Sequence, residues 1–155
     1  MKNTVRHWRL SPTSSVRYLT AEHILVLHKD IIDQTGGSHG IRDVGLLASV
    51  VERPRGATFG REHYPEFWTK AAVYLHGIAM NHVFVDGNKR TSITAAARFL
   101  FINGYQFHVS NDEMEQYVLR VVVDRLDIED IAKWFKLHWQ ASHSAGDWPK
   151  GQSGL

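Results

Sequence analysis

Apolar residues recur at helical spacing in several stretches of the chain, and short polar or glycine-rich segments separate these stretches. The clearest stretch follows the pattern i, i+3, i+4, i+7, i+8 in its residues Ile93, Ala96, Ala97, Leu100 and Phe101. An apolar stripe of this kind is typical of a helix that packs one face against a core. The predicted helices cover about residues 20–36, 43–54, 65–81, 88–103, 112–125 and 127–137.

Residues that commonly begin or end helices support these boundaries. The predicted N-caps, whose side chains would accept a hydrogen bond from the first turn, are Thr20, Asp43, Asn88 and Asn111. Pro65 suits the first turn of the third helix, and Gly104 suits the position after the end of the fourth. The last predicted helix carries the large apolar residues Ile131, Trp134, Phe135 and Leu137.

The β-structure is predicted to be minor. Residues 54–64 contain proline, two glycines and several charges without a helical period, which predicts an exposed loop or a short hairpin. Tyr105, Phe107 and Val109 alternate with polar residues and predict a short strand at most. The sequence therefore predicts an all-α fold, a bundle of about six or more helices with one minor β element.

The length and composition favour a single globular domain. A chain of 155 residues with 43% hydrophobic and 22% charged residues can bury a substantial core. We divide it into an N-terminal extension (residues 1–18), a domain (19–140) and a flexible C-terminal tail (141–155) that is rich in Ser and Gly. The net charge of +2 gives little support for nucleic-acid binding, and the lack of cysteine excludes disulfides and thiolate metal sites. No apolar run approaches the roughly 20 residues that span a bilayer, so we expect a cytoplasmic protein without membrane contact.

Residues 82–91, His-Val-Phe-Val-Asp-Gly-Asn-Lys-Arg-Thr, carry most of the candidate chemistry. They form the approach to the predicted helix 88–103 and its first turn. The start of a helix has unpaired backbone N–H groups and the positive end of the helix dipole, and both attract anions. Lys89 and Arg90 add two cations at the same place. A phosphate-binding site is therefore the natural interpretation.

Two residues of this segment are candidates for the chemical step. His82 would act as a general base that accepts a proton from an attacking hydroxyl group. Asp86 would hold Mg²⁺, which prefers carboxylate, water and phosphate oxygens as ligands. Each residue also has a structural interpretation. His82 would then be a partly buried histidine, and Asp86 would be a capping carboxylate at the helix start, a role that it could combine with metal binding.

The other polar residues of the segment are candidates for phosphate binding. Gly87 would let the backbone approach a phosphate closely, and Asn88 would cap the helix and donate from its amide group. Arg90 offers a planar fork to a phosphate, and Lys89 offers a mobile point charge. Two adjacent cations are usually only part of a solvated surface. At a helix N-terminus, however, positive charge is unfavourable unless an anion is bound there.

The segment also resembles a known family motif. The Fic/Doc family has the core pattern His-Pro-Phe-x-x-Gly-Asn-Gly-Arg-x-x-Arg, and residues 82–91 match the variant of its Doc (death-on-curing) branch, His-x-Phe-x-Asp-Ala/Gly-Asn-Lys-Arg-Thr. The likeness extends over about residues 19–138. It implies a Fic-type helical bundle in which His82 is the base, Asp86 the metal ligand, and Gly87, Asn88, Lys89 and Arg90 hold the phosphates.

Two departures from the Fic pattern bear on the reaction. Lys89 replaces the second glycine, which adds bulk and charge where an α-phosphate would lie, and Ile93 replaces the second arginine, which removes a γ-phosphate clamp. The likeness to the Doc branch implies a reversed nucleotide, so that the γ-phosphate of ATP meets a protein hydroxyl group and the protein acts as a kinase with Mg²⁺. The alternatives are transfer of AMP or UMP to a protein hydroxyl, and a non-catalytic corepressor that acts only when bound to an antitoxin.

The resemblance implies partners and a moving element as well. Doc toxins target a translation factor, elongation factor Tu, so the expected acceptor is a Ser or Thr hydroxyl of a similar protein, and the expected effect is an arrest of translation. The chain lacks an inhibitory Ser/Thr-x-x-x-Glu-Gly/Asn motif, so restraint would come from a separate Phd-like antitoxin. Residues 54–64 fall where such proteins carry a small β-hairpin flap that aligns the target segment by strand-like pairing.

Overall fold

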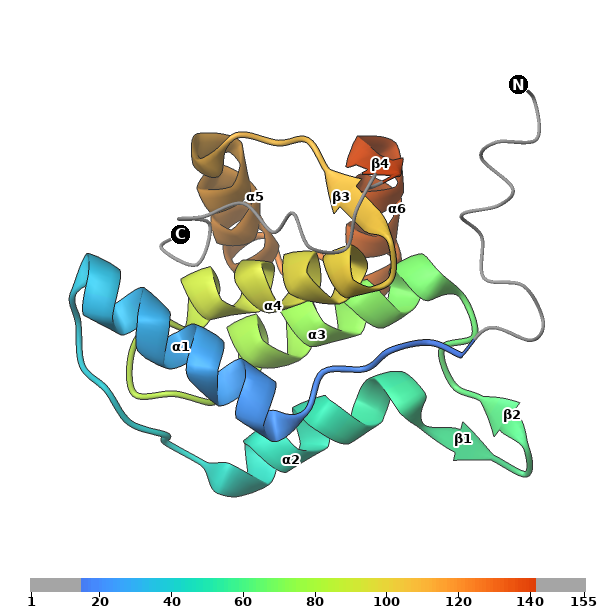
Figure 1. The fold of residues 1–155 in the computed structure, drawn as a ribbon, viewed down its shortest axis with the longest axis horizontal. Coiled ribbons are helices and arrows are strands. Elements are labelled where there is room, and N and C mark those ends of the chain that lie inside the picture. Colours follow the sequence, from blue (N-terminus) through green and yellow to red (C-terminus); the bar gives the residue numbers. More distant parts are fainter. Residues whose placement is uncertain (1–14, 142–155) are drawn as a thin grey trace.

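A computed structural model describes residues 15–141 of the chain (Figure 1). Its helices are α1 (Ala21–Thr35), α2 (Val44–Glu52), the short 3₁₀ helix η2 (Arg53–Arg55), α3 (Phe67–Asn81), α4 (Asn88–Ile102), α5 (Asn111–Val123) and α6 (Ile128–His138). Its strands are β1 (Ala57–Thr58), β2 (Arg61–Glu62), β3 (Tyr105–Phe107) and β4 (Trp139–Ala141). The predicted all-α class with six helices is confirmed. No helix within residues 15–141 combines the length and the apolar character that crossing a bilayer requires.

Helices α3 and α4 lie side by side at the centre of the fold, with α1 and α2 on one side and α5 and α6 on the other (Figure 1). Because neighbours surround both helices, most of their side chains are buried, including Tyr74 and Phe99, whose ring centroids are 5.0 Å apart. Helix α2 crosses α3 closely at Gly77, where an added Cβ would lie 3.0 Å from Val50 Cγ2. This enclosed helix pair presents its connecting loop, residues 82–87, at one end of the bundle.

The N-caps of the first two helices are confirmed, and that of α5 is corrected. Thr20 Oγ1 accepts a hydrogen bond from the N–H of the third residue of α1, and Asp43 Oδ1 does the same for α2, both at 3.1 Å. The predicted cap at Asn111 is wrong, because Ser110 Oγ accepts the hydrogen bond from Glu113 N (3.2 Å). Ser and Asn are about equally good N-caps, so propensity alone does not choose between two neighbours.

The predicted start of α3 is corrected, and one apolar residue of α6 lies on its exposed face. Helix α3 begins at Phe67, so Pro65 lies before the helix, and Glu66 still has extended backbone angles. In α6, the apolar Leu137 is 81% exposed. At 100° per residue, Phe135 lies about 40° around α6 from the buried Ile131, whereas Leu137 lies about 240° around it and faces away.

Both β elements are antiparallel pairs. The expected hairpin is present, with Ala57 opposite Glu62 in β1 and β2. The strand predicted at residues 105–109 is β3, and it pairs with β4, which had not been predicted. The remainder of the expected extension and tail falls on residues 1–14 and 142–155, which lie outside the described part of the chain.

The buried His76 of α3 should make the folded chain less stable in acid. Its Nδ1 atom is buried without a hydrogen-bond partner among the described residues, and burial, followed by the charge of Arg53, lowers the pKa of the imidazole from 6.5. As the pH falls below 6.5, the imidazole of His76 takes up a proton in the unfolded chain but stays neutral in the folded chain. The free energy of unfolding therefore falls until the pH reaches the lowered pKa of the folded state. We expect the urea midpoint to fall between about pH 7.5 and pH 5.5, and to fall less in His76→Gln. Equal falls in both proteins would contradict this assignment.

Candidate functional site

A cleft of about 540 Å³ lies where the loop between α3 and α4 meets the loop between α1 and α2. All six candidate residues identified in the sequence line this cleft: His82, Asp86, Gly87, Asn88, Lys89 and Arg90. Val122 of α5 lines it as well. The fold thus brings the candidate base, the candidate metal ligand and the candidate phosphate-binding residues to one open space.

Main-chain hydrogen bonds hold the loop between α3 and α4 in place. Residues 40–43, which precede α2, exchange such bonds with Val83 and Val85 at 2.8, 3.2 and 3.0 Å. Ile41 and Phe84 lie opposite each other as an isolated antiparallel bridge. The conformation of the loop therefore depends on a segment about 40 residues earlier in the chain, which no local pattern in the motif reveals.

His82 ends α3 in a left-handed conformation, with φ 50° and ψ 57°. Histidine adopts this conformation more often than most residues other than glycine. The Arg42 side chain stabilises the turn, because its Nε donates to the His82 carbonyl (2.6 Å) and its Nη2 donates to the Asn81 carbonyl (2.8 Å). The imidazole is exposed and makes no hydrogen bond with another described residue, so both ring nitrogens remain available at the cleft.

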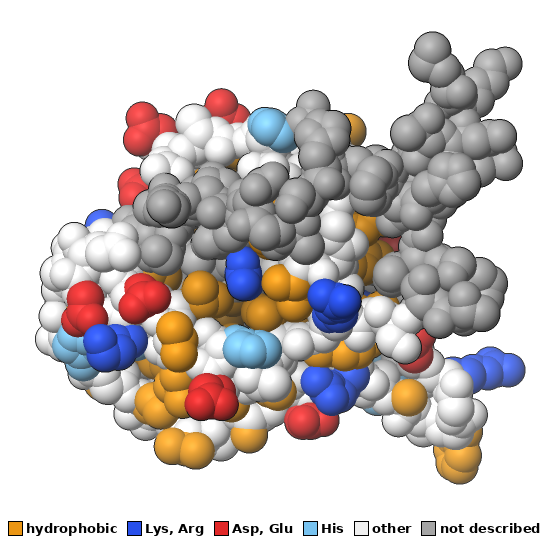
Figure 2. Space-filling model, viewed as in Figure 1, with side chains coloured by type: hydrophobic (Ala, Val, Ile, Leu, Met, Phe, Trp, Pro, Cys, Tyr) orange, Lys and Arg blue, Asp and Glu red, His pale blue; other side chains and the backbone are white. Residues whose placement is uncertain are grey.

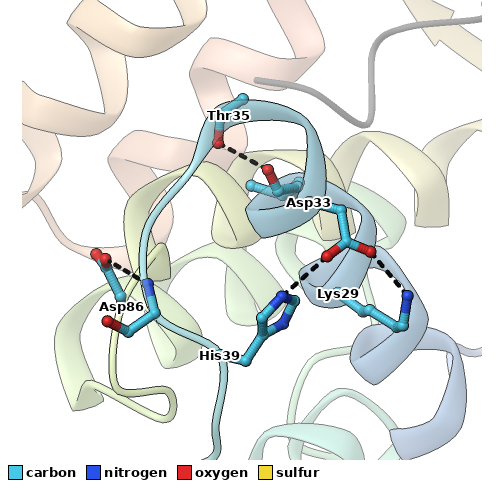
Figure 3. A network of polar contacts seen from close by, with 7 residues as sticks. Lys29, Asp33, Thr35, His39 and Asp86 are labelled. Carbon is cyan, nitrogen blue, oxygen red and sulfur yellow. Dashed lines mark hydrogen bonds and ion pairs between the residues drawn. The ribbon is translucent and has the colours of Figure 1, made fainter.

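The Asp86 carboxylate is fixed by two backbone N–H groups. Its Oδ2 accepts from Ser38 N at 3.1 Å, as Figure 3 shows, and its Oδ1 accepts from Gly87 N at 2.8 Å. These two hydrogen bonds, with a smaller contribution from the charge of Arg90, hold the pKa of Asp86 below its ordinary value. The group is therefore ionised at neutral pH. Gly37 leaves room for it, because a Cβ at that position would lie 2.5 Å from Asp86 Oδ2.

A contact between His39 and Asp33 ties the same loop back to α1. His39 Nε2 lies 2.9 Å from Asp33 Oδ1, and Lys29 Nζ lies 2.7 Å from Asp33 Oδ2 (Figure 3). Solvent screens exposed contacts of this kind, so each contributes little to stability. Lys29 and Asp33 both belong to α1, so it is the contact of His39 with Asp33 that favours the loop position in which Ser38 faces Asp86.

The start of α4 differs from the prediction, because Asn88 is the first helical residue and not the N-cap. Gly87 precedes the helix with φ 75°, and no side chain caps it. The Asn88 side chain turns back to Phe84, where Oδ1 accepts from Phe84 N (2.8 Å) and Nδ2 donates to Phe84 O (2.9 Å). Asn88 therefore braces the loop with its side chain, and what it can offer an anion is its backbone N–H.

Lys89 and Arg90 are exposed on the first turn of α4. The N–H groups of this turn have no acceptor within the helix, and the dipole makes the same end positive. Two cations at this end are electrostatically unfavourable by themselves. An anion in the cleft would remove that cost, so the electrostatics of the site favour a phosphate group.

His28 of α1 is a functional candidate that the sequence motif does not include. Its imidazole is buried and stacks on the Phe84 ring at 3.8 Å, and its Nε2 donates a hydrogen bond to the Asp86 carbonyl at 2.8 Å. Burial lowers the pKa of His28, which favours the neutral ring. The Asp86 C=O and the Gly87 N–H belong to one trans peptide group and point in opposite directions. The hydrogen bond from His28 to the carbonyl therefore makes the Gly87 N–H point away from His28. His28 lies four residues from both Ile24 and Ile32, so the sequence places it on the buried face of the helix, and this was the pattern that could have identified it.

The hairpin lies at the opposite end of α3 from the cleft (Figure 1). It precedes α3 and His82 follows it, and the 15 residues of the helix span about 22 Å. Its two-residue turn, Phe59–Gly60, has positive φ at both positions, as type I′ turns require. Phe59 is fully exposed, and the hairpin end of the surface protrudes with an apolar tip (Figure 2). The predicted hairpin exists, but its described residues do not line the cleft.

Lys70 of α3 anchors this hairpin. Replacing either partner of its ion pair should change the free energy of unfolding by a different amount. Its buried Nζ contacts Glu62 Oε1 at 2.7 Å and donates to the Pro54 carbonyl at 3.1 Å. Glu62→Gln leaves a buried ammonium group without its counter-charge, so we expect a loss of about 1–3 kcal/mol in the free energy of unfolding. Lys70→Met removes the charge as well and should cost less. Urea denaturation measures both, and a larger loss in Lys70→Met would contradict this account.

The metal-binding capacity of the site rests on Asp86. Within residues 15–141, no group of three or more His, Cys, Asp or Glu side chains could hold a metal ion. A single ionised carboxylate is nevertheless a suitable protein ligand for Mg²⁺, which usually keeps several waters and binds through one or two carboxylates together with phosphate oxygens. The residues present therefore fit Mg²⁺ that arrives with a nucleotide, and they do not form a site for a tightly bound structural metal.

Comparison with known proteins gives consistent matches. The family model described as Fic/DOC family matches residues 18–100. The chain is 42% identical over 99 residues to Toxin Doc of Mycolicibacterium smegmatis, a match that covers 63% of this chain and 76% of that protein. It is 28% identical over 117 residues to Protein kinase doc of Escherichia phage P1, which covers 76% of this chain and 91% of that protein. Both matched regions are long enough to include more than the motif itself.

Proposed function

The chain belongs to the Fic/DOC family, and from this premise we propose that it is a Doc-type toxin that transfers the γ-phosphate of ATP to a protein hydroxyl group. One observation carries the proposal: His82, the ionised Asp86 and the start of α4 with Lys89 and Arg90 converge on one cleft. The names of the relatives, Toxin Doc and Protein kinase doc, support the toxin and kinase parts of the proposal.

In the proposed reaction, the γ-phosphate lies against the start of α4 and the acceptor hydroxyl lies beside His82. The hydroxyl oxygen forms a bond to the γ-phosphorus, and the bond from that phosphorus to the bridging oxygen of the β-phosphate breaks. The hydroxyl proton passes to the imidazole of His82, and ADP leaves. Such transfer depends mainly on positioning and charge neutralisation. Lys89, Arg90 and the free N–H groups of α4 supply both.

Asp86 is the proposed ligand of Mg²⁺. Its two oxygens each accept one backbone hydrogen bond, and a carboxylate has about four acceptor directions, so both oxygens retain capacity for a cation. Bound Mg²⁺ would neutralise phosphate charge. The contribution of the chain itself is to hold the carboxylate in place at the cleft, through the N–H groups of Ser38 and Gly87.

Two residues favour transfer of phosphate over transfer of a nucleotide. Lys89 stands where the Fic pattern has a glycine, and its side chain takes space beside the first turn of α4. Ile93 stands where that pattern has its second arginine. It is uncharged and only 1% exposed, so this position offers no cation to a more distant phosphate. Both departures support a nucleotide that presents its γ-phosphate to His82.

ATP labelled on its α- or its γ-phosphate tests the proposed reaction. We expect only the γ label to remain on the acceptor protein when the chain is incubated with ATP, Mg²⁺ and a bacterial extract. Retention of the α label would identify nucleotidyl transfer of AMP and overturn the kinase proposal. A reaction with His82→Ala in place of the wild-type chain serves as the blank.

We also propose the partners that this function requires. The acceptor would be a Ser or Thr hydroxyl of a translation factor similar to elongation factor Tu, so that transfer arrests translation. A Phd-like antitoxin would restrain the chain, and the name of the relative Toxin Doc supports such a pairing. Mass spectrometry of bacterial proteins after expression of the chain identifies the acceptor, and a gain of one phosphate is the expected change.

A further inference from the structure

A second, smaller groove of about 250 Å³ lies between α4 and α5. Ile93 and Val118 are buried and form its apolar floor, and Leu119, which is 48% exposed, forms part of its edge. Glu115 and Gln116 are exposed and line it with polar groups. Neither polar side chain makes a hydrogen bond or an ion pair with another described residue, so both are available to a ligand. The groove thus combines an apolar surface with uncommitted donors and acceptors.

This groove adjoins the cleft. Lys89 and Arg90 line both spaces, so the two cations stand at the boundary between them. Helix α5 also borders both, since Val122 lines the cleft and Leu119, about one turn earlier, lines the groove. Ile93 lies four residues beyond Lys89 on α4, a rise of about 6 Å. A ligand with its phosphates against the start of α4 can therefore extend into the groove.

We propose that the groove between α4 and α5 binds the base and ribose of the nucleotide whose phosphates occupy the cleft. This proposal rests on the proposed function and adds to it the place of the nucleoside. A planar, largely apolar base can lie on Ile93, Val118 and Leu119. The arginine that the Fic pattern has at position 93 would put a charge on this floor, whereas isoleucine makes it apolar.

The polar groups of the groove match the edges of a nucleoside. The Gln116 amide can donate and accept at the same time, as the edge of a purine base requires. The Glu115 carboxylate can accept hydrogen bonds from ribose hydroxyls or from a base amino group. The guanidinium plane of Arg90 can also stack on a base at the boundary. At about 250 Å³ the groove is smaller than the roughly 300–1,000 Å³ of sites for whole drug-sized ligands, so it would hold the nucleoside part alone, with the phosphates outside it.

The larger groove between α1 and α4 is a less suitable place for the nucleoside. It measures about 620 Å³ and is lined by residues such as His23, Val26 and Arg98. It shares no lining residue with the cleft, so phosphates at the start of α4 would not lead a nucleoside into it. The shared lining residues Lys89 and Arg90 therefore favour the groove between α4 and α5.

Titration with ATP and with inorganic tripolyphosphate, both with Mg²⁺, tests the proposal. The wild-type chain should bind ATP more tightly than tripolyphosphate. Leu119→Asn replaces an apolar contact by an uncharged group of similar size, and Gln116→Ala removes the amide. Each should weaken ATP binding by about tenfold and leave tripolyphosphate binding unchanged. Val123→Asn is the matched control, because Val123 is 69% exposed on the same helix and lines neither space.

The outcomes separate this proposal from the proposed function. ATP affinity that stays unchanged in both variants overturns the nucleoside site alone, as does an equal affinity of the wild-type chain for ATP and tripolyphosphate. Equal losses for both ligands also overturn it, because the variants would then act on the phosphates. A wild-type chain that binds neither ligand removes the proposed function, and the nucleoside site with it. Gln116 is exposed on the surface, so Gln116→Ala remains informative if Leu119→Asn does not fold.

Discussion

Replacing His82 by alanine is expected to reduce phosphate transfer by about 10²- to 10⁴-fold while ATP affinity stays close to that of the wild type. The imidazole is exposed at the cleft and makes no hydrogen bond with another described residue, so its removal leaves the packing intact. The backbone turn keeps the two hydrogen bonds from Arg42, whose acceptors are main-chain carbonyls. The variant therefore removes the proton acceptor and little else.

Single-turnover transfer of labelled γ-phosphate and titration with ATP measure the two properties separately. His108→Ala is a suitable control, because His108 is also exposed and lines none of the described pockets near the motif. Transfer at the wild-type rate in His82→Ala would refute the assignment of the base. If transfer is lost but expression of His82→Ala still arrests bacterial growth, the arrest does not depend on catalysis, and a non-catalytic binding function gains support.

The helices and their buried faces were predictable because they depend on local spacing. The apolar period from Ile93 to Phe101 corresponds to α4, and the caps at Thr20 and Asp43 follow from side chains that reach only three residues along the chain. The errors at Asn111 and Pro65 have the same origin, since neighbouring residues with similar preferences leave a boundary undecided by one or two positions.

The members of the site were also predictable, but what holds them in place was not. The motif specifies which residues carry charge and which can accept a proton, and all six line the cleft. Asn88 shows the limit of the motif, because its side chain forms two hydrogen bonds with Phe84, and no pattern in the sequence distinguishes this from capping. The contacts of His28 and Ser38 with Asp86 join segments 58 and 48 residues apart, and they exist only after α1 packs against α4.

This dependence on a distant loop leads to the second prediction, which concerns Gly37. An alanine Cβ at this position would lie 3.2 Å from Asp86 Cγ and only 2.5 Å from Asp86 Oδ2. Real Cβ atoms essentially never approach another heavy atom as closely as 2.5 Å. Either the carboxylate or the loop that carries Ser38 must move, and in both cases the hydrogen bond that orients Asp86 is weakened or lost. A displacement of about 1 Å in a catalytic group can cost about 100-fold in rate. We expect Gly37→Ala to reduce transfer by about this factor and to raise the Mg²⁺ concentration needed for half-maximal transfer.

Gly36→Ala is the matched control that makes this expectation specific. Gly36 precedes Gly37 in the same loop and also has positive φ, at 83° compared with 113°, so alanine introduces backbone strain at both positions. A Cβ at Gly36 meets nothing within 4 Å, whereas a Cβ at Gly37 meets the carboxylate. Both variants should therefore unfold at lower temperature, but only Gly37→Ala should change the Mg²⁺ dependence of transfer. Equal losses of transfer in the two variants, with unchanged Mg²⁺ dependence, would show that the loop contributes only to stability and that Asp86 does not depend on Ser38 for its position.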